Sequence, residues 1–204
     1  MTDSAHLPAR LSVRQKMGDA ILDLVLTVPS SSEQAAPHRP EIKARAVGRA
    51  AARKASLLAG SFALPPGLLG WMTVLPELLG VWRLQAQMVS DIATVYGQQG
   101  HLNREQMLYC LFKHMSAQLF RDVVARVGER YVVRVASTPV IRGIVQALGG
   151  RLTTTMATKG VSRLLPLVGA VGVGAYAYYD TTQVAKTAIE LFSRGVVVEN
   201  DTSV

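Results

Sequence analysis

The sequence predicts an all-α fold, a multi-helix bundle that contains two apolar helical hairpins interrupted by glycine and proline. Apolar residues recur at helical spacing along most of the 204-residue chain, a pattern typical of amphipathic helices. Prolines and glycines interrupt two long apolar stretches, where they would break or bend a helix. The Val-rich stretch 131–148 lacks a hairpin turn such as Asn-Gly, so we assign it to helix rather than strand.

The chain length fits one principal domain with terminal extensions. Residues 1–28 are predicted to hold an N-terminal amphipathic helix, which either docks on the main body or lies separately. Residues 29–40 are rich in Ser, Pro and Ala and predict a flexible linker, because they lack the apolar residues that would offset the entropy of ordering. Residues 41–197 form the expected helical domain, and residues 198–204 a disordered tail.

Prolines and glycines set the helix boundaries that we expect within this domain. Pro40 suits the first turn of a helix that runs to about Ala59. A Pro-Pro pair breaks the segment that follows, Pro76 should start a new helix or kink the existing one, and Gly97 should close it.

The second half of the domain is predicted to continue as helices. Asn103 and Gln106 form a capping-box pattern, which opens a helix expected to end at Gly128. The Gly-Gly pair at 149–150 predicts a turn, and residues 164–194 a last long helical unit.

The charge balance favours an anionic partner. The formal net charge is +8 and the sequence pI about 10.0, whereas charged residues make up only 18% of the chain. Nucleic acid or the negatively charged cytoplasmic leaflet would both suit this balance. The absence of a recognition-helix motif and of interleaved stacking aromatics argues against nucleic acid. The lone Cys110 fits a reducing compartment.

A basic stripe is the clearest candidate for binding lipid or another anion. Arg45, Arg49 and Arg53 follow one another at four-residue spacing, and Lys54 lies beside them. One helix face could therefore present several cations to an anionic surface. The alternative is an ordinary solvated helix face.

Two apolar segments predict membrane contact or close packing. Residues 164–179 carry no charge, and they are shorter than the roughly 20 residues that a helix needs to cross a bilayer. Small residues in this segment would let helix backbones approach closely, and tyrosines at its end suit a membrane interface. Residues 64–81 form the companion segment. A buried soluble core is the alternative for both. The residues singled out are Gly169, Gly172, Gly174 and Tyr178 in the first, with Trp71 and Trp82 at or near the ends of the second.

Several charges stand in apolar surroundings and predict a buried polar network that fixes helix register. These are Glu77, Arg83, Asp91 and Asp180. Cys110 and His114 share a helix face, but their spacing reveals neither an orienting group nor an oxyanion hole. We therefore predict no catalytic residue, metal site or cofactor.

Short motifs in both apolar segments resemble those of the bacterial EcsC family. They are Leu-Pro-Pro-Gly from Leu64, Leu-Pro-Glu-Leu from Leu75, Asp-Ile-Ala-Thr-Val-Tyr-Gly from Asp91, Leu-Pro-Leu-Val-Gly-Ala-Val-Gly from Leu165 and Tyr-Tyr-Asp-Thr-Thr from Tyr178. The resemblance covers roughly Arg49 to Arg194 and leaves the N-terminal helix and linker outside it. It implies a bacterial helical protein linked with the cytoplasmic membrane, with a membrane transporter or GTPase component as a protein partner. It implies no catalytic residues.

The first hypothesis is therefore a non-enzymatic accessory or lipid-binding protein. We expect it in the cytoplasm, peripheral to or shallowly inserted in the inner membrane. A soluble helical protein-interaction module is the second hypothesis. A hydrolase that uses buried carboxylates is the third and the least favoured.

Overall fold

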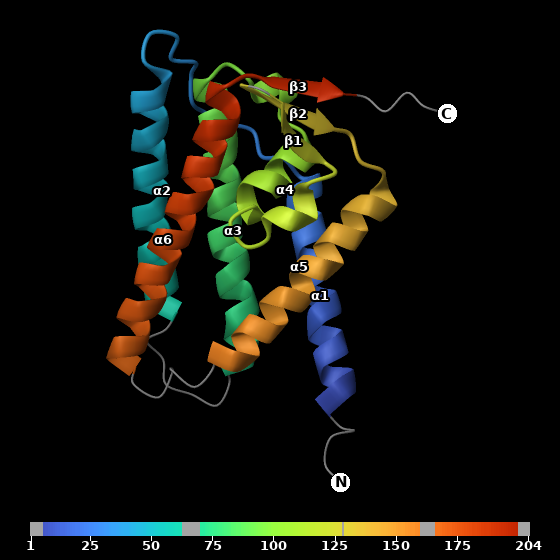
Figure 1. The fold of residues 1–204 in the computed structure, drawn as a ribbon. Coiled ribbons are helices and arrows are strands. Elements are labelled where there is room, and N and C mark those ends of the chain that lie inside the picture. The colour runs from blue at the N-terminus through green and yellow to red at the C-terminus, as the bar shows by residue number, and fades with distance from the viewer. Residues whose placement is uncertain (1–5, 63–69, 128, 160–165, 200–204) are drawn as a thin grey trace.

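The computed structural model describes residues 6–62, 70–127, 129–159 and 166–199, and it is an all-α multi-helix bundle with one small sheet (Figure 1). The predicted fold class is confirmed. The α-helices are α1 (His6–Leu26), α2 (Pro40–Phe62), α3 (Gly70–Val95), α4 (Arg104–Phe112), α5 (Thr138–Lys159) and α6 (Pro166–Ser193). The short elements are the 3₁₀ helices η1 (Gln99–His101) and η2 (Ala117–Phe120) and the strands β1 (Val124–Val127), β2 (Arg130–Arg134) and β3 (Val196–Glu199).

Helix α3 lies at the centre of the bundle and packs against α1, α2, α4 and α6. Its buried residues include Met88 and Ile92, and Trp82 meets the ring of Phe112 edge-on at 5.5 Å between centroids. Pro76 does not start a new helix, because α3 is continuous from Gly70. The companion apolar segment is thus largely the first half of the central helix.

Helices α2 and α6 run antiparallel in close contact (Figure 1). A Cβ added to Gly48 would lie 2.8 Å from the Cβ of Ala185, and one added to Gly174 would lie 3.0 Å from the backbone oxygen of Ser56. Neither helix could approach so closely with a larger residue at these positions. Small residues therefore set the spacing of the two helices.

The N-terminal helix docks on the body, as one of the two alternatives anticipated. Met17, Ile21 and Val25 of α1 are buried in the same core cluster as the residues of α3. The segment after α1 runs along α3, where Ser90 donates a hydrogen bond to the Pro29 carbonyl over 2.6 Å and the Ala36 amide donates to the Val95 carbonyl over 3.0 Å.

Two predicted helix boundaries are confirmed. Gly97, with a φ of +71°, ends α3, and the amide of Gln98 donates to the carbonyl of Ala93 as in a Schellman motif. Asn103 and Gln106 form the expected capping box at the start of α4, where each side chain accepts from the backbone amide of the other residue.

The stretch between α4 and α5 differs from the prediction. Helix α4 ends at Phe112 instead of near Gly128, and β1 and β2 form an antiparallel pair. The start of the Val-rich stretch, from Tyr131 to Arg134, is therefore strand rather than helix. Its alternating burial, with Tyr131 and Val133 inside, is the period-2 pattern of a half-buried strand. The Gly-Gly pair at 149–150 is not a turn, because α5 continues through it.

The chain after α6 completes the sheet. Gly195, with a φ of +72°, turns the chain out of α6, and β3 then pairs in parallel with β2. This strand includes Val198 and Glu199, which the sequence assigned to the tail. The sheet thereby ties the C-terminal end of α6 to the β1–β2 hairpin.

The close contact between α2 and α6 can be tested by adding one methyl group. Gly48→Ala is expected to lower the free energy of unfolding by about 1–3 kcal/mol, because its Cβ would overlap that of Ala185. Gly172→Ala is the matched control in α6, where an added Cβ meets nothing within 4 Å, and it should raise that energy by about 0.5–1 kcal/mol. Urea denaturation measures both, and equal stabilisation by the two variants would contradict a tight crossing.

Candidate functional site

The predicted basic stripe lies on the outer face of α2. Arg45, Arg49, Arg53 and Lys54 are all exposed, while the side of the helix next to the stripe buries a row of alanines that includes Ala52. Only Arg45 of these four has an ion pair among the described residues, with Glu41 one turn earlier at 2.5 Å. The stripe is therefore open to an external anion.

A groove of about 490 Å³ separates the stripe from α6. Gly48 and Ala185 carry little or no side chain, so the helices meet closely while the longer side chains on either side stand apart as walls. The groove is lined by Arg45, Gly48 and Arg49 from α2, and by Tyr178, Thr182, Ala185, Lys186, Ile189, Glu190, Ser193 and Arg194 from α6 and the residue that follows it. Cations thus line this groove from two helices.

The carboxylate of Glu190 is held by other partners. It accepts a hydrogen bond from the Tyr131 hydroxyl over 2.7 Å, and Lys113 lies 3.4 Å from its second oxygen. The Tyr131 hydrogen bond is the main cause that lowers the pKa of Glu190, and Lys113 and Arg194 lower it further against the opposing effect of burial. Glu190 therefore anchors α6 to β2 and α4.

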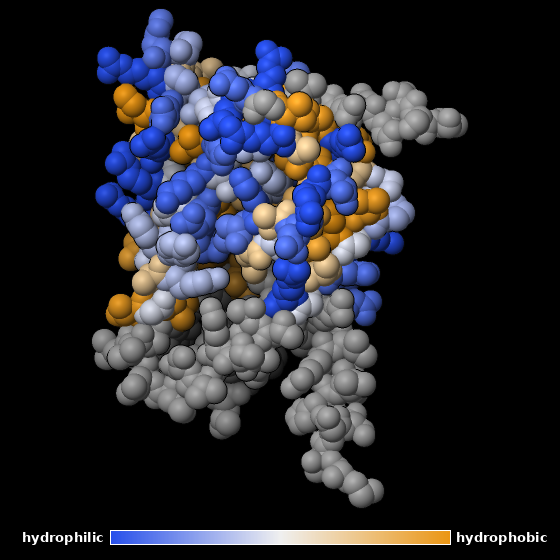
Figure 2. Space-filling model, in the orientation of Figure 1, coloured by the Kyte–Doolittle hydropathy of each residue, from blue (hydrophilic) through white to orange (hydrophobic). Residues whose placement is uncertain are grey.

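Apolar and aromatic side chains are exposed at the other end of the same two helices. Leu57 on α2 is 76% exposed and Val171 on α6 is 70% exposed, with Tyr176, Tyr178 and Tyr179 next along α6 at 53%, 40% and 61%. Figure 2 shows hydrophobic residues at the lower ends of α2 and α6 and mainly hydrophilic ones higher up. The surface therefore changes from apolar to basic along the helices.

The contacts between α2 and α6 show which residues of the two helices lie at the same level along the change from apolar to basic surface. Gly48 lies opposite Ala185, and Ser56 lies opposite Gly174. Leu57 follows Arg49 by eight residues, or about 12 Å along α2. The tyrosines fall between the apolar end and the groove.

The other residues predicted for membrane contact or packing have different surroundings. Trp82 is buried in the core rather than at an interface. Gly172 is exposed, and Gly174 packs on α2. Trp71, Glu77 and Gly169 lie on helices, but their side chains fall outside the described residues.

The predicted polar network is two separate clusters. Asp180 accepts from Gln85 over 2.8 Å and pairs with His114 at 2.7 Å. Asp91 accepts from Gln87 over 2.9 Å and from the hydroxyl of Ser31 over 2.6 Å. Arg83 is exposed on α3, in contrast to the expected burial. The clusters join α3 to α6 and to the segment after α1, as register-fixing groups would.

Cys110 and His114 do not form a reactive pair. Cys110 is fully buried, and burial strongly raises the pKa of its thiol, which keeps the group protonated. His114 is engaged with Asp180. Within the described ranges, no cluster of three or more His, Cys, Asp and Glu residues could hold a metal ion.

Sequence reasoning missed the contribution of α6 to the groove. Lys186, Glu190 and Arg194 follow the apolar segment at four-residue spacing, which places them on one helix face. That spacing was a usable signal, but it did not show that this face lies beside the stripe of α2.

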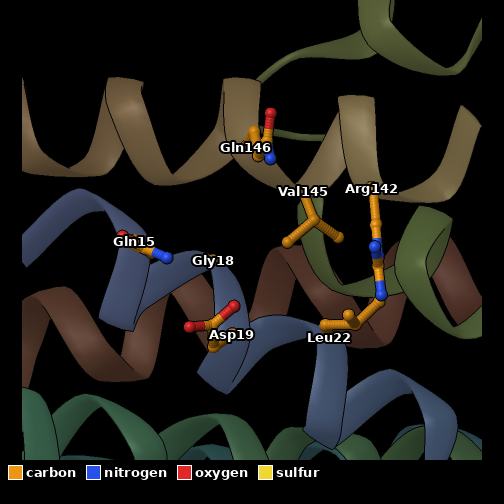
Figure 3. Close-up of a pocket in the computed structure, with 7 residues that line it drawn as sticks. All are labelled: Gln15, Gly18, Asp19, Leu22, Arg142, Val145 and Gln146. Atoms are coloured by element: carbon orange, nitrogen blue, oxygen red, sulfur yellow. The ribbon is translucent and has the colours of Figure 1, made fainter. Parts of the chain in front are cut away.

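A larger groove of about 740 Å³ lies between α1 and α5 (Figure 3). Asp19 and Gln15 stand on α1, and Arg142 and Gln146 stand on α5. Its single acid and single base balance in charge, so this groove does not favour an anion.

Comparison with known proteins gives no further guide to the site. The chain matches no protein-family model, no curated protein and no solved structure. Along the described parts of the chain, no helix is both long and apolar enough to span a membrane.

Glu190 should make stability depend on pH. Its pKa in the folded protein lies below the ordinary value of 4.5, so its contribution is present above pH 4.5 and is lost as the pH falls through the folded pKa. Glu190→Gln should therefore lower the free energy of unfolding at pH 7, and the difference from the wild type should shrink towards pH 3. Urea denaturation at both values tests this. The exposed Glu129→Gln serves as control, and a difference that grows in acid would contradict the assignment.

Proposed function

We propose that this chain is a non-enzymatic accessory protein that binds anionic lipid as a peripheral component of a membrane. The observation that carries the proposal is the continuous surface of α2 and α6, where the stripe of Arg45, Arg49 and Arg53 lies above exposed apolar and aromatic side chains. Proteins that bind a membrane surface combine these two features.

Electrostatic attraction supplies the first part of the binding energy. A Lys or Arg close to an anionic leaflet contributes about 1 kcal/mol, and this attraction decays within a Debye length. The four cations of the stripe are all exposed, and three of them have no ion pair among the described residues. They can therefore approach lipid headgroups without first breaking contacts in the protein.

The apolar end supplies the second part. Among the described side chains of these two helices, Leu57 and Val171 are the most exposed of the large apolar residues. The tyrosines above them have rings that favour the boundary between acyl chains and headgroups. With this end lowest in the interface, Arg53 and Arg49 would lie at or just above the headgroup layer, roughly 5–7 Å thick.

The polar groups inside the bundle favour a non-enzymatic role. Asp91 and Asp180 are each held by two hydrogen-bonding or charged partners, and neither lines either groove described above. A hydrolase would need such a carboxylate to face substrate and water.

The EcsC-like motifs extend the proposal to a place and a partner. On that resemblance, the protein would act at the cytoplasmic face of a bacterial inner membrane, together with a transporter or GTPase component. Among the described residues, most of the motif positions lie on α3 and α6, which provide much of the core, so these motifs support a shared fold more than a shared partner.

Neutralising the stripe should weaken membrane binding strongly. The triple variant Arg45→Gln, Arg49→Gln and Arg53→Gln is expected to bind vesicles of phosphatidylcholine and phosphatidylserine about a hundredfold more weakly, because each cation contributes about 1 kcal/mol. Cosedimentation at physiological salt measures this.

The control removes the same charge elsewhere. Lys16 on α1, Arg121 after η2 and Arg142 on α5 are exposed and stand on elements other than α2 and α6, so changing all three to Gln should weaken binding far less. Equal losses in the two variants would mean that only net charge matters. If the wild type binds no vesicle, the peripheral-membrane proposal fails and the protein-interaction module becomes the better account.

The apolar end gives a second test of the same function. Leu57→Ser with Val171→Ser should reduce vesicle binding several-fold and leave the free energy of unfolding within about 0.5 kcal/mol, because both side chains are exposed. Leu26→Ser, at an exposed position at the end of α1, is the control. Unchanged vesicle binding in the double variant would show that the apolar end does not enter the membrane.

A further inference from the structure

The α2–α6 groove differs from a diffuse basic surface because its cations converge from two helices. Arg45 and Arg49 stand on one wall and Lys186 on the other, with Arg194 at the end where α6 finishes. Glu190 is the one carboxylate that lines the groove with these four cations, and Arg45 also pairs with Glu41 outside it. Binding to an anionic vesicle would require only the outward-facing cations of α2. The cations on the α6 side of the groove therefore need a separate explanation.

The protein's own groups satisfy the carboxylate of Glu190 more fully than they satisfy the cations of the groove. Glu190 is engaged by Tyr131 and Lys113 on the side of α4 and β2. Among the described residues, neither Arg49 nor Lys186 has an ion pair, although both line the groove from opposite helices. Two cations placed in this way suit a group with more than one negative charge.

The size and shape of the groove limit the ligand. A volume of about 490 Å³ suits a small polar headgroup rather than a polymer. Arg presents a planar fork of donors that matches phosphate, and Lys adds a point charge. The hydroxyls of Thr182 and Ser193 already donate to backbone carbonyls, so recognition falls to the cations.

The groove opens towards the apolar end of the same helices. Tyr178 lines its lower part, and Tyr176 and Leu57 follow in the direction of that end. A lipid headgroup could therefore occupy the groove while its acyl chains stay in the membrane beneath.

We infer that the α2–α6 groove is a specific site for a phosphomonoester group, held between Arg45 and Arg49 on α2 and Lys186 and Arg194 on the α6 side. This site rests on the proposed membrane function when the phosphomonoester belongs to a lipid. A soluble phosphate ester presents the same chemistry.

The test compares two vesicles of matched surface charge. One contains phosphatidic acid, whose headgroup is a phosphomonoester, and the other contains phosphatidylserine, whose phosphate is a diester. We expect the full chain to bind the first about tenfold more tightly, as one further charge-assisted contact would give.

Two variants locate the preference. Lys186→Gln with Arg194→Gln should lose the preference and keep most of the binding to phosphatidylserine vesicles, since the stripe is intact. Arg53→Gln with Lys54→Gln, on α2 but outside the groove, should weaken binding to both kinds of vesicle equally and keep the preference for phosphatidic acid. All four residues are exposed, so thermal unfolding should be unchanged and serves as the folding control.

The outcomes separate the two proposals. Equal binding of the wild type to both vesicles, or a preference that persists in the Lys186 and Arg194 variant, would overturn the phosphomonoester site and leave the membrane function standing. If neither vesicle binds, the membrane function fails, and calorimetry with inositol trisphosphate decides. If the wild type binds inositol trisphosphate and the Lys186 and Arg194 variant does not, the result would support a site for a soluble phosphate ester. If the wild type does not bind inositol trisphosphate, the proposed site would be overturned.

Discussion

The proposed binding surface depends on the close approach of α2 and α6. Gly48 fits against Ala185, and Gly174 fits against the backbone of α2, so the two helices lie nearer than ordinary side chains allow. This spacing makes one surface from charges on α2 and aromatic rings on α6. A bulkier residue at Gly48 would push the helices apart and widen the groove between them.

The helices are also fixed at the other end of α6. The hydrogen bond from Tyr131 and the cation of Lys113 hold Glu190, and Gly195 turns the chain into β3, which pairs with β2. Helix α6 is thus clamped by small-residue packing on one side and by the sheet on the other. Its basic and apolar residues therefore keep fixed positions relative to α2.

Much of the fold could be predicted from local signals. The start of α4 followed from the capping box at Asn103, and the end of α3 from Gly97, because each depends on a few neighbouring residues. The β1–β2 hairpin was missed because Gly128, between the two strands, was assigned as the stop of a helix, although a Gly-X pair also suits a two-residue hairpin turn. Its strands become stable only through burial of Tyr131 and Val133 in the core and through pairing with β3, which lies far along the chain.

The site shows the same division between local and distant information. The stripe from Arg45 to Arg53 was predictable, since helical periodicity alone aligns its members. The partners of Asp180 could not be predicted, because Gln85 comes from α3 and His114 from the turn after α4. The same holds for Lys186, whose place beside Arg49 depends on the register that Gly48 sets against α6. The arginines of the stripe are exposed and the core closes beneath them, so most cations of the proposed binding surface are separate from the residues that determine folding. These exposed positions can therefore change in sequence at little cost to the fold.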